Sequence, residues 1–449
     1  MATRVRSLTG WGRTAPTTAT VIDGTAVDAI VSAVREAGRR GVIARGLGRS
    51  YGDAAQNAGG VVIDMTALNR VHSLDVDAAT VDLDAGVSID RLLRMVVPHG
   101  LWVPVLPGTR HVTVGGAIAA DIHGGNHHTE GSFANHVLSM DLLLADGTIV
   151  TLTPGSGSEL FWATTGGMGF TGIVLRATLR LKRVESTYFK TDVERAANLD
   201  ELMDKLSEND DRYTYSKAWF DSVSTGSRMG RGTLFRASMA SREDLPPKLR
   251  RDPLRFDATS LGTVPDVFPS GMLNRVTAAA FNEFYFRVNR PQQGAILNLT
   301  SFYHILDVAN DWNRVYGPQG FLQYQFVVPF GQESVVRKTM EVISSSGHLS
   351  CLNVLKRFGA GNQGPLSFPM PGWTLAVDMP VRTGLGALCQ QLDDLVLQAG
   401  GRLYLAKDSR LTAETFAAMY PRLDEWKHVC SKADPTHLFT SDLSRRLDL

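Results

Sequence analysis

Cysteine is scarce in this chain, with only three among 449 residues. Cys351, Cys389 and Cys430 are odd in number and far apart, which argues against a disulfide framework and against a zinc site of the CxxC type. Long apolar runs are missing too, so we expect no membrane-spanning segment and no signal peptide. If the protein meets a membrane, the sequence predicts contact from the side.

An excess of charge of one sign is also missing, because 46 Lys and Arg face 45 Asp and Glu. Nothing in this balance points to nucleic acid, and 43% hydrophobic residues are ordinary for a globular protein. The length predicts roughly two to three domains. Short strands and helices, among them a helix over 25–40 and one capped by Ser88, continue to about residue 185. Longer strands follow, so a second domain is expected there.

Glycine gathers where an apolar run, Val42 to Ala44, enters a loop at residues 44–53 with three glycines and two arginines. Glycine allows close approach of the backbone, so successive N–H groups can converge on a phosphate while Arg45 or Arg49 offsets its charge. A surface turn would explain the loop alone equally well. The loop has no phosphate-loop lysine, and Tyr51 stands where a dinucleotide fingerprint needs its third glycine.

A literal G-x-G-x-x-G does occur at Gly167, Gly169 and Gly172, but its order is inverted. A Rossmann site needs a strand before and a helix after, whereas here a helix precedes and a strand follows. A second glycine segment, residues 106–124, predicts a short helix near 115–120 whose first N–H groups are free to bind an anion. Two anion loops in one domain favour a diphosphate.

Three further patterns leave alternatives open. His123, His127 and His128 with Asp121 could form a metal cluster, but no matching ligand set accompanies them, so no metal is expected. Gln323 and Gln325 share one face of an apolar strand, where they face either solvent or sugar hydroxyls. Lys407 follows an apolar strand and points either into a cleft or to the surface.

Together the loop at 44–53, the segments 106–123 and 166–173 and the C-terminal residues 404–410 resemble the vanillyl-alcohol-oxidase-like flavoproteins. The resemblance implies an α+β fold with a two-part FAD-binding domain, residues 1–185 and 402–449. A substrate-binding domain, residues 186–401, would contain an antiparallel sheet flanked by helices. Segments 120–133, 213–221, 321–329, 362–380 and 403–422 are most similar to the branch that oxidises a polyprenyl-phosphoryl ribose.

The resemblance also implies site residues. Lys407 and His123 would be catalytic, and the expected FAD contacts are Ala44, Arg45, Gly46, Leu47, Gly48, Arg49, Ser50, Tyr51, Gly52, Asp53, Ala54, Gly108, Thr109, Thr113, Val114, Gly115, Gly116, Ala120, Asp121, Ile122, His123, Ile173 and Tyr404. The expected substrate or inhibitor pocket comprises Tyr51, Trp219, Tyr303, Gln323, Gln325, Lys356, Ala376, Asp378 and Lys407. Several relatives attach FAD through a histidine where this chain has Arg49, so non-covalent FAD is predicted.

The implied reaction is oxidation of the C2′ hydroxyl of decaprenylphosphoryl ribose to a ketone, which an NADH-dependent short-chain reductase subunit then reduces to the arabinose for cell-wall arabinan. The nearest alternative is a flavin oxidase of aldonolactones or alditols. Peripheral contact with the inner membrane or cell envelope is expected.

This chain departs from the family at two positions. Gly125 replaces a lysine of many relatives. Ala376 replaces a cysteine that covalent inhibitors capture, which predicts an active enzyme with weakened covalent inhibition.

Overall fold

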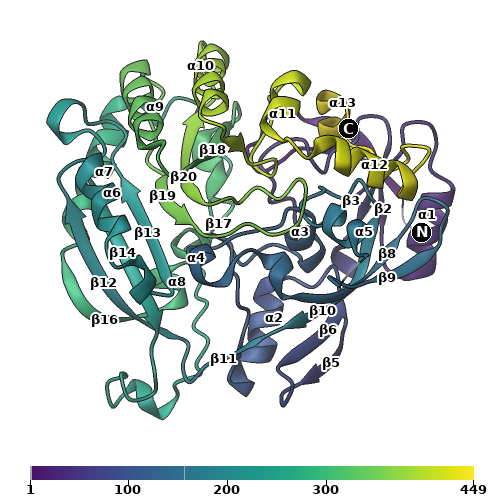
Figure 1. The fold of residues 1–449 in the computed structure, drawn as a ribbon, viewed down its shortest axis with the longest axis horizontal. Helices are drawn as coiled ribbons and strands as arrows, with labels where there is room; N and C mark the ends of the chain where they lie inside the picture. Colours follow the sequence, from purple (N-terminus) through teal and green to yellow (C-terminus); the bar gives the residue numbers. More distant parts are fainter. Residues whose placement is uncertain (1–2, 156) are drawn as a thin grey trace.

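The computed structural model describes residues 3–155 and 157–449, which fold around three main sheets (Figure 1). The first sheet has the order β1 (Thr3–Leu8), β2 (Thr17–Asp23), β4 (Val61–Asp64) and β3 (Val42–Arg45), with the last three parallel. Helix α1 (Val27–Arg35) buries Ile30 and Val34. It ends at Arg35, before the predicted end at 40, and a separate turn follows in which the Gly41 N–H donates to the Gly38 carbonyl at 2.8 Å.

The second sheet is antiparallel and has the order β5 (Val71–Asp75), β6 (Thr80–Asp84), β10 (Ile173–Arg180), β8 (Val137–Leu143) and β9 (Ile149–Leu152). Helix α2 (Ile89–Val96) begins where the sequence predicted, since the Ser88 hydroxyl accepts a hydrogen bond from the Arg91 N–H at 3.1 Å. Helix α5 (Glu159–Thr164) precedes β10, so the glycines between them follow a helix and precede a strand. That order confirms the rejection of a Rossmann fingerprint.

The third sheet is antiparallel throughout, with the order β16 (Gln292–Asn298), β12 (Tyr188–Ala196), β14 (Gly232–Met239), β13 (Tyr215–Phe220), β19 (Asn353–Phe358), β20 (Gly372–Pro380), β18 (Phe321–Pro329) and β21 (Arg402–Leu403). Helices α9 (Glu333–Ser346) and α10 (Leu385–Gln398) lie together over β18 and β20 (Figure 1). Every residue of β20 is buried, because the sheet is covered on both faces.

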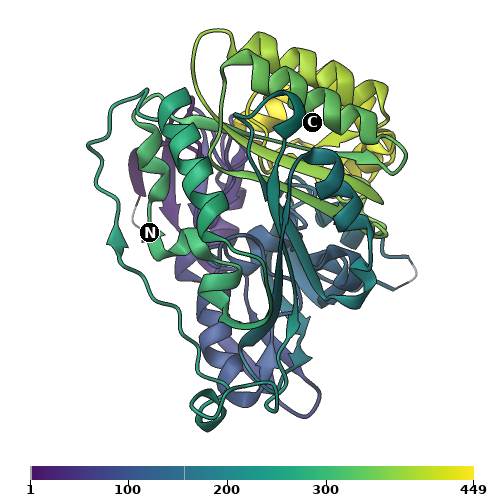
Figure 2. The same ribbon diagram turned by 90° about the vertical axis from the view of Figure 1, so that its left-hand side faces the viewer.

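The remaining elements connect and cover these sheets. They are α3 (Val114–Ala119), α4 (His127–Glu130), α6 (Leu199–Ser207), α7 (Arg275–Val288), α8 (Leu299–Phe302), α11 (Ala413–Met419), α12 (Leu423–Ala433), α13 (Asp442–Leu447), the pair β7 (Leu101–Trp102) with β11 (Lys182–Arg183), and the pair β15 (Gly262–Thr263) with β17 (Ala309–Asn310). An extended connection leads to α7 along the outside of the molecule (Figure 2). Among the described residues, none of the helices combines the length and apolar character that crossing a bilayer requires.

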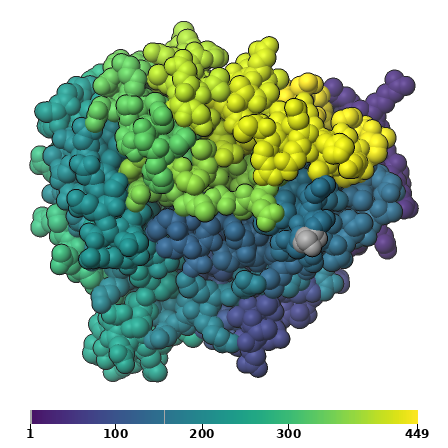
Figure 3. All heavy atoms as spheres, viewed as in Figure 1, coloured from purple at the N-terminus to yellow at the C-terminus, as the bar shows by residue number. Residues whose placement is uncertain are grey.

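The C-terminal segment returns to the N-terminal part of the chain. In the space-filling view its yellow atoms lie directly on the blue and purple N-terminal segments (Figure 3). The Trp426 indole N–H of α12 donates to the Ala163 carbonyl of α5 at 2.9 Å. The predicted α+β fold, with an antiparallel sheet flanked by helices, is confirmed.

Candidate active site

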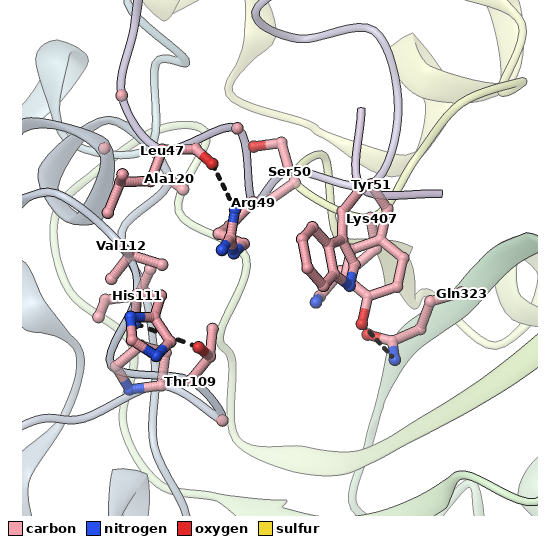
Figure 4. Close-up of a pocket in the computed structure, with 18 of the residues that line it drawn as sticks. Leu47, Arg49, Ser50, Tyr51, Thr109, His111, Val112, Ala120, Gln323 and Lys407 are labelled. Atoms are coloured by element: carbon pink, nitrogen blue, oxygen red, sulfur yellow. Dashed lines mark hydrogen bonds between the residues drawn. The ribbon is translucent and has the colours of Figure 1, made fainter. Parts of the chain in front are cut away.

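A cavity of about 330 Å³ lies where the loop after β3, the segment around α3 and the third sheet meet. Figure 4 shows Tyr51, Lys407 and Gln323 grouped on one side, with Thr109, His111 and Val112 on the other. Polar groups therefore converge on the cavity from segments far apart in the sequence. That combination of concavity and convergent polar groups is typical of a ligand site.

The loop after β3 supplies unused backbone donors. Within the described part of the chain, the N–H groups of Leu47, Gly48, Arg49 and Ser50 donate no hydrogen bond, and all four residues line the cavity. Gly48 has φ +66°, and a Cβ there would lie 2.5 Å from the Arg45 guanidinium. Successive free N–H groups in such a loop suit an anion.

The two glycine segments touch each other at Gly46, where a Cβ would lie 2.3 Å from the Thr113 hydroxyl oxygen. The predicted anion site at the start of α3 is wrong, because its N–H groups are already paired. Val114 and Gly115 donate to the carbonyls of Val87 and Ala85 at 2.9 and 2.8 Å. The Gly116 N–H donates to the Thr113 hydroxyl at 3.2 Å. The first N–H groups of α3 are therefore not free to bind an anion.

The C-terminal segment holds the same loop against Lys407. The Tyr51 N–H donates to the Ala406 carbonyl at 2.9 Å, and a Cβ at Gly52 would lie 2.0 Å from the Asp408 carbonyl oxygen. The Arg446 guanidinium of α13 binds both Asp53 and Asp408 at 2.8 Å. Asp53 is thus an ion-pair partner outside the cavity lining, and the loop and the Lys407 segment are fixed to each other.

The two loop arginines have different surroundings. Arg45 donates to the carbonyls of Ala55 and Thr9 at 2.9 and 2.7 Å, so its side chain holds the chain around the loop. Arg49 donates to the Leu47 carbonyl at 2.6 Å and lies 4.1 Å from the ring centroid of Trp11. Burial lowers the pKa of both, but a guanidinium remains charged at neutral pH. Both therefore contribute positive charge beside the free N–H groups.

The third sheet presents one polar face to the cavity. Its register places Gln325 beside Ala376, Ala376 beside Val354 and Val354 beside Trp219. Gln323 pairs with Asp378 across the same two strands, and its amide donates to the Asp378 carboxylate. Both glutamines thus face the cavity, as the alternation in β18 allowed.

Lys407 and Asp378 are the ionisable pair at the centre of this wall. The Lys407 ammonium lies 3.7 Å from the ring centroid of Tyr51. Burial lowers the pKa of Lys407, the charge of Asp378 raises it and Lys356 lowers it further. Burial raises the pKa of Asp378, against the hydrogen bond from Gln323 and the charge of Lys407. The pair can therefore hold or release a proton near neutral pH.

His123 lies in an aromatic enclosure formed by Phe358, Phe368 and Tyr404, with ring centroids 4.8, 5.5 and 5.1 Å away. Burial and the charge of Lys356 hold its pKa well below the usual range, so the ring is neutral. The Gln325 amide nitrogen lies 3.1 Å from His123 Nε2. The Gln325 amide therefore engages Nε2, while Nδ1 has no hydrogen-bond partner among the described residues.

His127 and His128 form hydrogen-bond contacts with other parts of the backbone. His127 Nδ1 accepts a hydrogen bond from the Gly359 N–H at 3.2 Å, and His128 Nε2 lies 2.9 Å from the Tyr213 carbonyl oxygen. Among the described residues, no group of three or more His, Cys, Asp or Glu side chains is arranged to hold a metal ion.

Most residues singled out from the sequence line the cavity. Those outside the lining are Asp53, Val114, Gly115, Asp121, Ile173, Trp219 and Tyr303. Asp121 is fully buried, and its carboxylate accepts hydrogen bonds from Ser132, Ser367, Asn362 and the Ala134 N–H. The Trp219 indole donates to the Cys351 carbonyl at 3.1 Å, and the Tyr303 hydroxyl donates to the Leu106 carbonyl at 2.9 Å.

Sequence reasoning missed part of the lining: some of these residues lie inside the segments 106–124 and 404–410 but were not singled out, and the rest carry no motif. The missed residues are Trp11, Ala55, Pro107, His111, Val112, Ala119, Met168, Leu306, Asp307, Ala309, Asn310, Asp311, Trp312, Leu352, Val354 and Ala406. Met168 was indicated indirectly. It lies between Gly167 and Gly169, in the glycine segment rejected as a Rossmann site, whose backbone could still lie flat against an extended ligand. The segment 306–312 had no such signal, because only the tertiary fold brings it to the loop after β3.

Comparison with known proteins gives the same picture. A model described as an FAD binding domain matches residues 18–153, and one described as D-arabinono-1,4-lactone oxidase matches residues 377–447. A Mycolicibacterium smegmatis protein named decaprenylphosphoryl-beta-D-ribose oxidase is 54% identical, over 100% of this chain and 98% of its own length. An uncharacterized Streptomyces coelicolor protein is 41% identical over 81% of this chain and 100% of its own length. A Streptomyces alditol oxidase is 32% identical over only 32% of this chain and 34% of its own length.

The residues at the cavity fit FAD. Four free N–H groups and two arginines suit a diphosphate, and at Gly108 a Cβ would meet nothing within 4 Å, so the backbone there is open to a ligand. The full-length similarity to one oxidase, the FAD-binding match and this cradle agree with one another. The chain belongs to the decaprenylphosphoryl-β-D-ribose oxidase family and is an FAD-dependent oxidoreductase.

Proposed function

We propose that this enzyme oxidises the C2′ hydroxyl of decaprenylphosphoryl-β-D-ribose to the 2′-ketone. The observation that carries the proposal is the 54% identity, over the full chain, to a relative named for that substrate. A short-chain reductase that uses NADH would then reduce the ketone to the arabinose epimer needed for cell-wall arabinan. The two proteins would together act as a 2′-epimerase.

In the proposed reaction, Lys407 removes the hydroxyl proton. Its lowered pKa supports this role, because the neutral amine is the base. We assign His123 to holding the reactants in register, because its Nε2 is already engaged by the Gln325 amide. When bound, FAD supplies the hydride acceptor. Gln323, Gln325 and Asp378 would bind sugar hydroxyls.

The proposed cofactor contacts are those of the expected residues that line the cavity, led by the loop at residues 46–52. Binding would be non-covalent, because Arg49 takes the position of the attaching histidine. We propose residues 1–185 and 402–449 as the FAD-binding domain and 186–401 as the substrate domain. The sheet organisation supports this division, except that β21, at its boundary, joins the third sheet.

Anaerobic mixing tests the substrate. Decaprenylphosphoryl-β-D-ribose is expected to bleach the oxidised flavin absorbance and yield a product that has lost two hydrogen atoms. Aldonolactones and alditols are the comparison, because residues 377–447 match a lactone-oxidase model. Bleaching by those compounds alone would exclude the proposed substrate.

We also propose peripheral membrane contact through the surface around α7. Leu261, Val276, Phe284, Val288 and Ile305 are large apolar side chains at least half exposed. The basic residues Lys248, Arg250, Arg251 and Arg255 are also exposed in the segment that leads to α7. Exposed apolar groups with nearby cations are the combination that anionic membranes attract.

Vesicle sedimentation tests this surface. The protein is expected to pellet with vesicles containing anionic lipid, and the double variant Phe284→Ser, Val288→Ser is expected to pellet several-fold less. Because both side chains are exposed, flavin content and unfolding temperature should stay unchanged. Equal pelleting of both proteins would disprove the assignment.

A further inference from the structure

Two lysines lie side by side on one face of the third sheet: Lys356 lines the cavity, and Lys217 lies next to it, outside the lining. Strands β13 and β19 are neighbours, and their register pairs Trp219 with Val354 and Ala218 with Leu355 (Figure 1). One step along, this register places Lys217 beside Lys356, at the strand spacing of about 4.8 Å. Val354 and Lys356 both line the cavity, so their face is the one that meets a ligand.

This pair is electrostatically unfavourable as it stands. Like charges at opposite positions of neighbouring strands destabilise a sheet. Within the described residues, no carboxylate lies within 4 Å of either ammonium group, although the protein pairs many of its other cations. Burial lowers the pKa of Lys356 to about 8, and burial with the charge of Lys356 lowers that of Lys217 to about 7. An anion bound between the two ammonium groups would offset their mutual repulsion.

Each lysine keeps donors available. Lys356 makes no hydrogen bond in the described part of the chain and faces the cavity. Lys217 donates one of its three N–H groups to the Phe302 carbonyl. The rings of Phe302 and Tyr303 lie 5.0 and 5.2 Å from its nitrogen, which helps to keep the charged form in this place.

We propose that Lys217 and Lys356 bind the phosphate group of the substrate. This inference rests on the proposed function, because the proposed substrate carries a phosphodiester next to the ribose. Asp378, four residues along β20 from the Thr374 that pairs with Lys356, is left with Lys407 for the sugar hydroxyls. A phosphate held by the lysine pair would fix which end of the ribose meets Lys407. The site recognises a phosphate monoester or diester and has no need of the lipid.

Steady-state kinetics with two substrates tests the pair. Lys217→Met is expected to raise KM for decaprenylphosphoryl-β-D-ribose about tenfold or more, with kcat little changed, since it removes a charged hydrogen bond. KM for an uncharged alkyl β-D-riboside should stay the same. Lys217→Arg should restore most of the lost affinity. Lys190→Met is the matched control, because Lys190 lies in the same sheet but is exposed and paired with Asp244.

The outcomes separate this inference from the proposed function. An equal rise of KM for both substrates, or no rise for either, would overturn the lysine pair. If decaprenylphosphoryl-β-D-ribose fails to bleach the wild-type flavin, the proposed function fails. A second measurement then still decides the site: inorganic phosphate should perturb the flavin spectrum of the wild type but not that of Lys217→Met or Lys356→Met. No perturbation of the wild type would refute it.

Discussion

Lys407→Met is expected to leave FAD bound and to slow flavin reduction by about 10²- to 10⁴-fold, the usual contribution of a positioned base. The side chain lies over Tyr51 and makes no hydrogen bond in the described part of the chain, so removing its charge breaks no structural contact of that kind. Methionine keeps the length of the side chain. The measurement is the rate of anaerobic bleaching, alongside the ratio of FAD to protein.

The same variant carries a pH prediction. Because burial lowers the pKa of Lys407 below its ordinary value of 10.5, the neutral amine forms at lower pH than in solution. The reduction rate of the wild type should therefore rise with pH through an inflection well below 10.5, and this inflection should vanish in the variant. Lys432→Met, at an exposed position of α12, is the control. Loss of FAD from Lys407→Met, or unchanged bleaching, would show that its role is misassigned.

Gly52→Ala is expected to abolish FAD retention and lower the unfolding temperature. The new Cβ would lie 2.0 Å from the Asp408 carbonyl oxygen, and backbone cannot move aside as a flexible side chain can. Overpacking typically costs about 1–3 kcal/mol. The clash also forces the loop after β3 away from the Lys407 segment, which the Tyr51 N–H and Arg446 hold against it. FAD bound without a covalent link would then be lost.

Gly38→Ala is the matched control for this change. A Cβ at Gly38 meets nothing within 4 Å, and the residue is exposed after α1. Flavin content after gel filtration and thermal unfolding report the two effects. A yellow Gly52→Ala protein with wild-type stability would mean that the loop tolerates separation from residue 408.

Local features could be predicted from the sequence because they depend on neighbours along the chain. The Ser88 hydroxyl caps α2 three residues away, and alternation in β18 puts Gln323 and Gln325 on one face. The glycine loop after β3 has its donors free, as its composition indicated. The start of α3 was mispredicted, since its N–H groups meet the carbonyls of Val87 and Ala85 from a preceding turn.

By itself, the sequence determined the kinds of groups available. They are a glycine loop after a buried strand, two amides on one face of a strand, and a lysine that follows a further apolar strand. Only the tertiary structure decided which of them meet. Asp53 pairs with Arg446 at the far end of the chain, and Lys217 comes to lie beside Lys356 through the antiparallel register of β13 and β19. Such contacts depend on long-range strand pairing and on the return of the C-terminal segment, which no local pattern encodes.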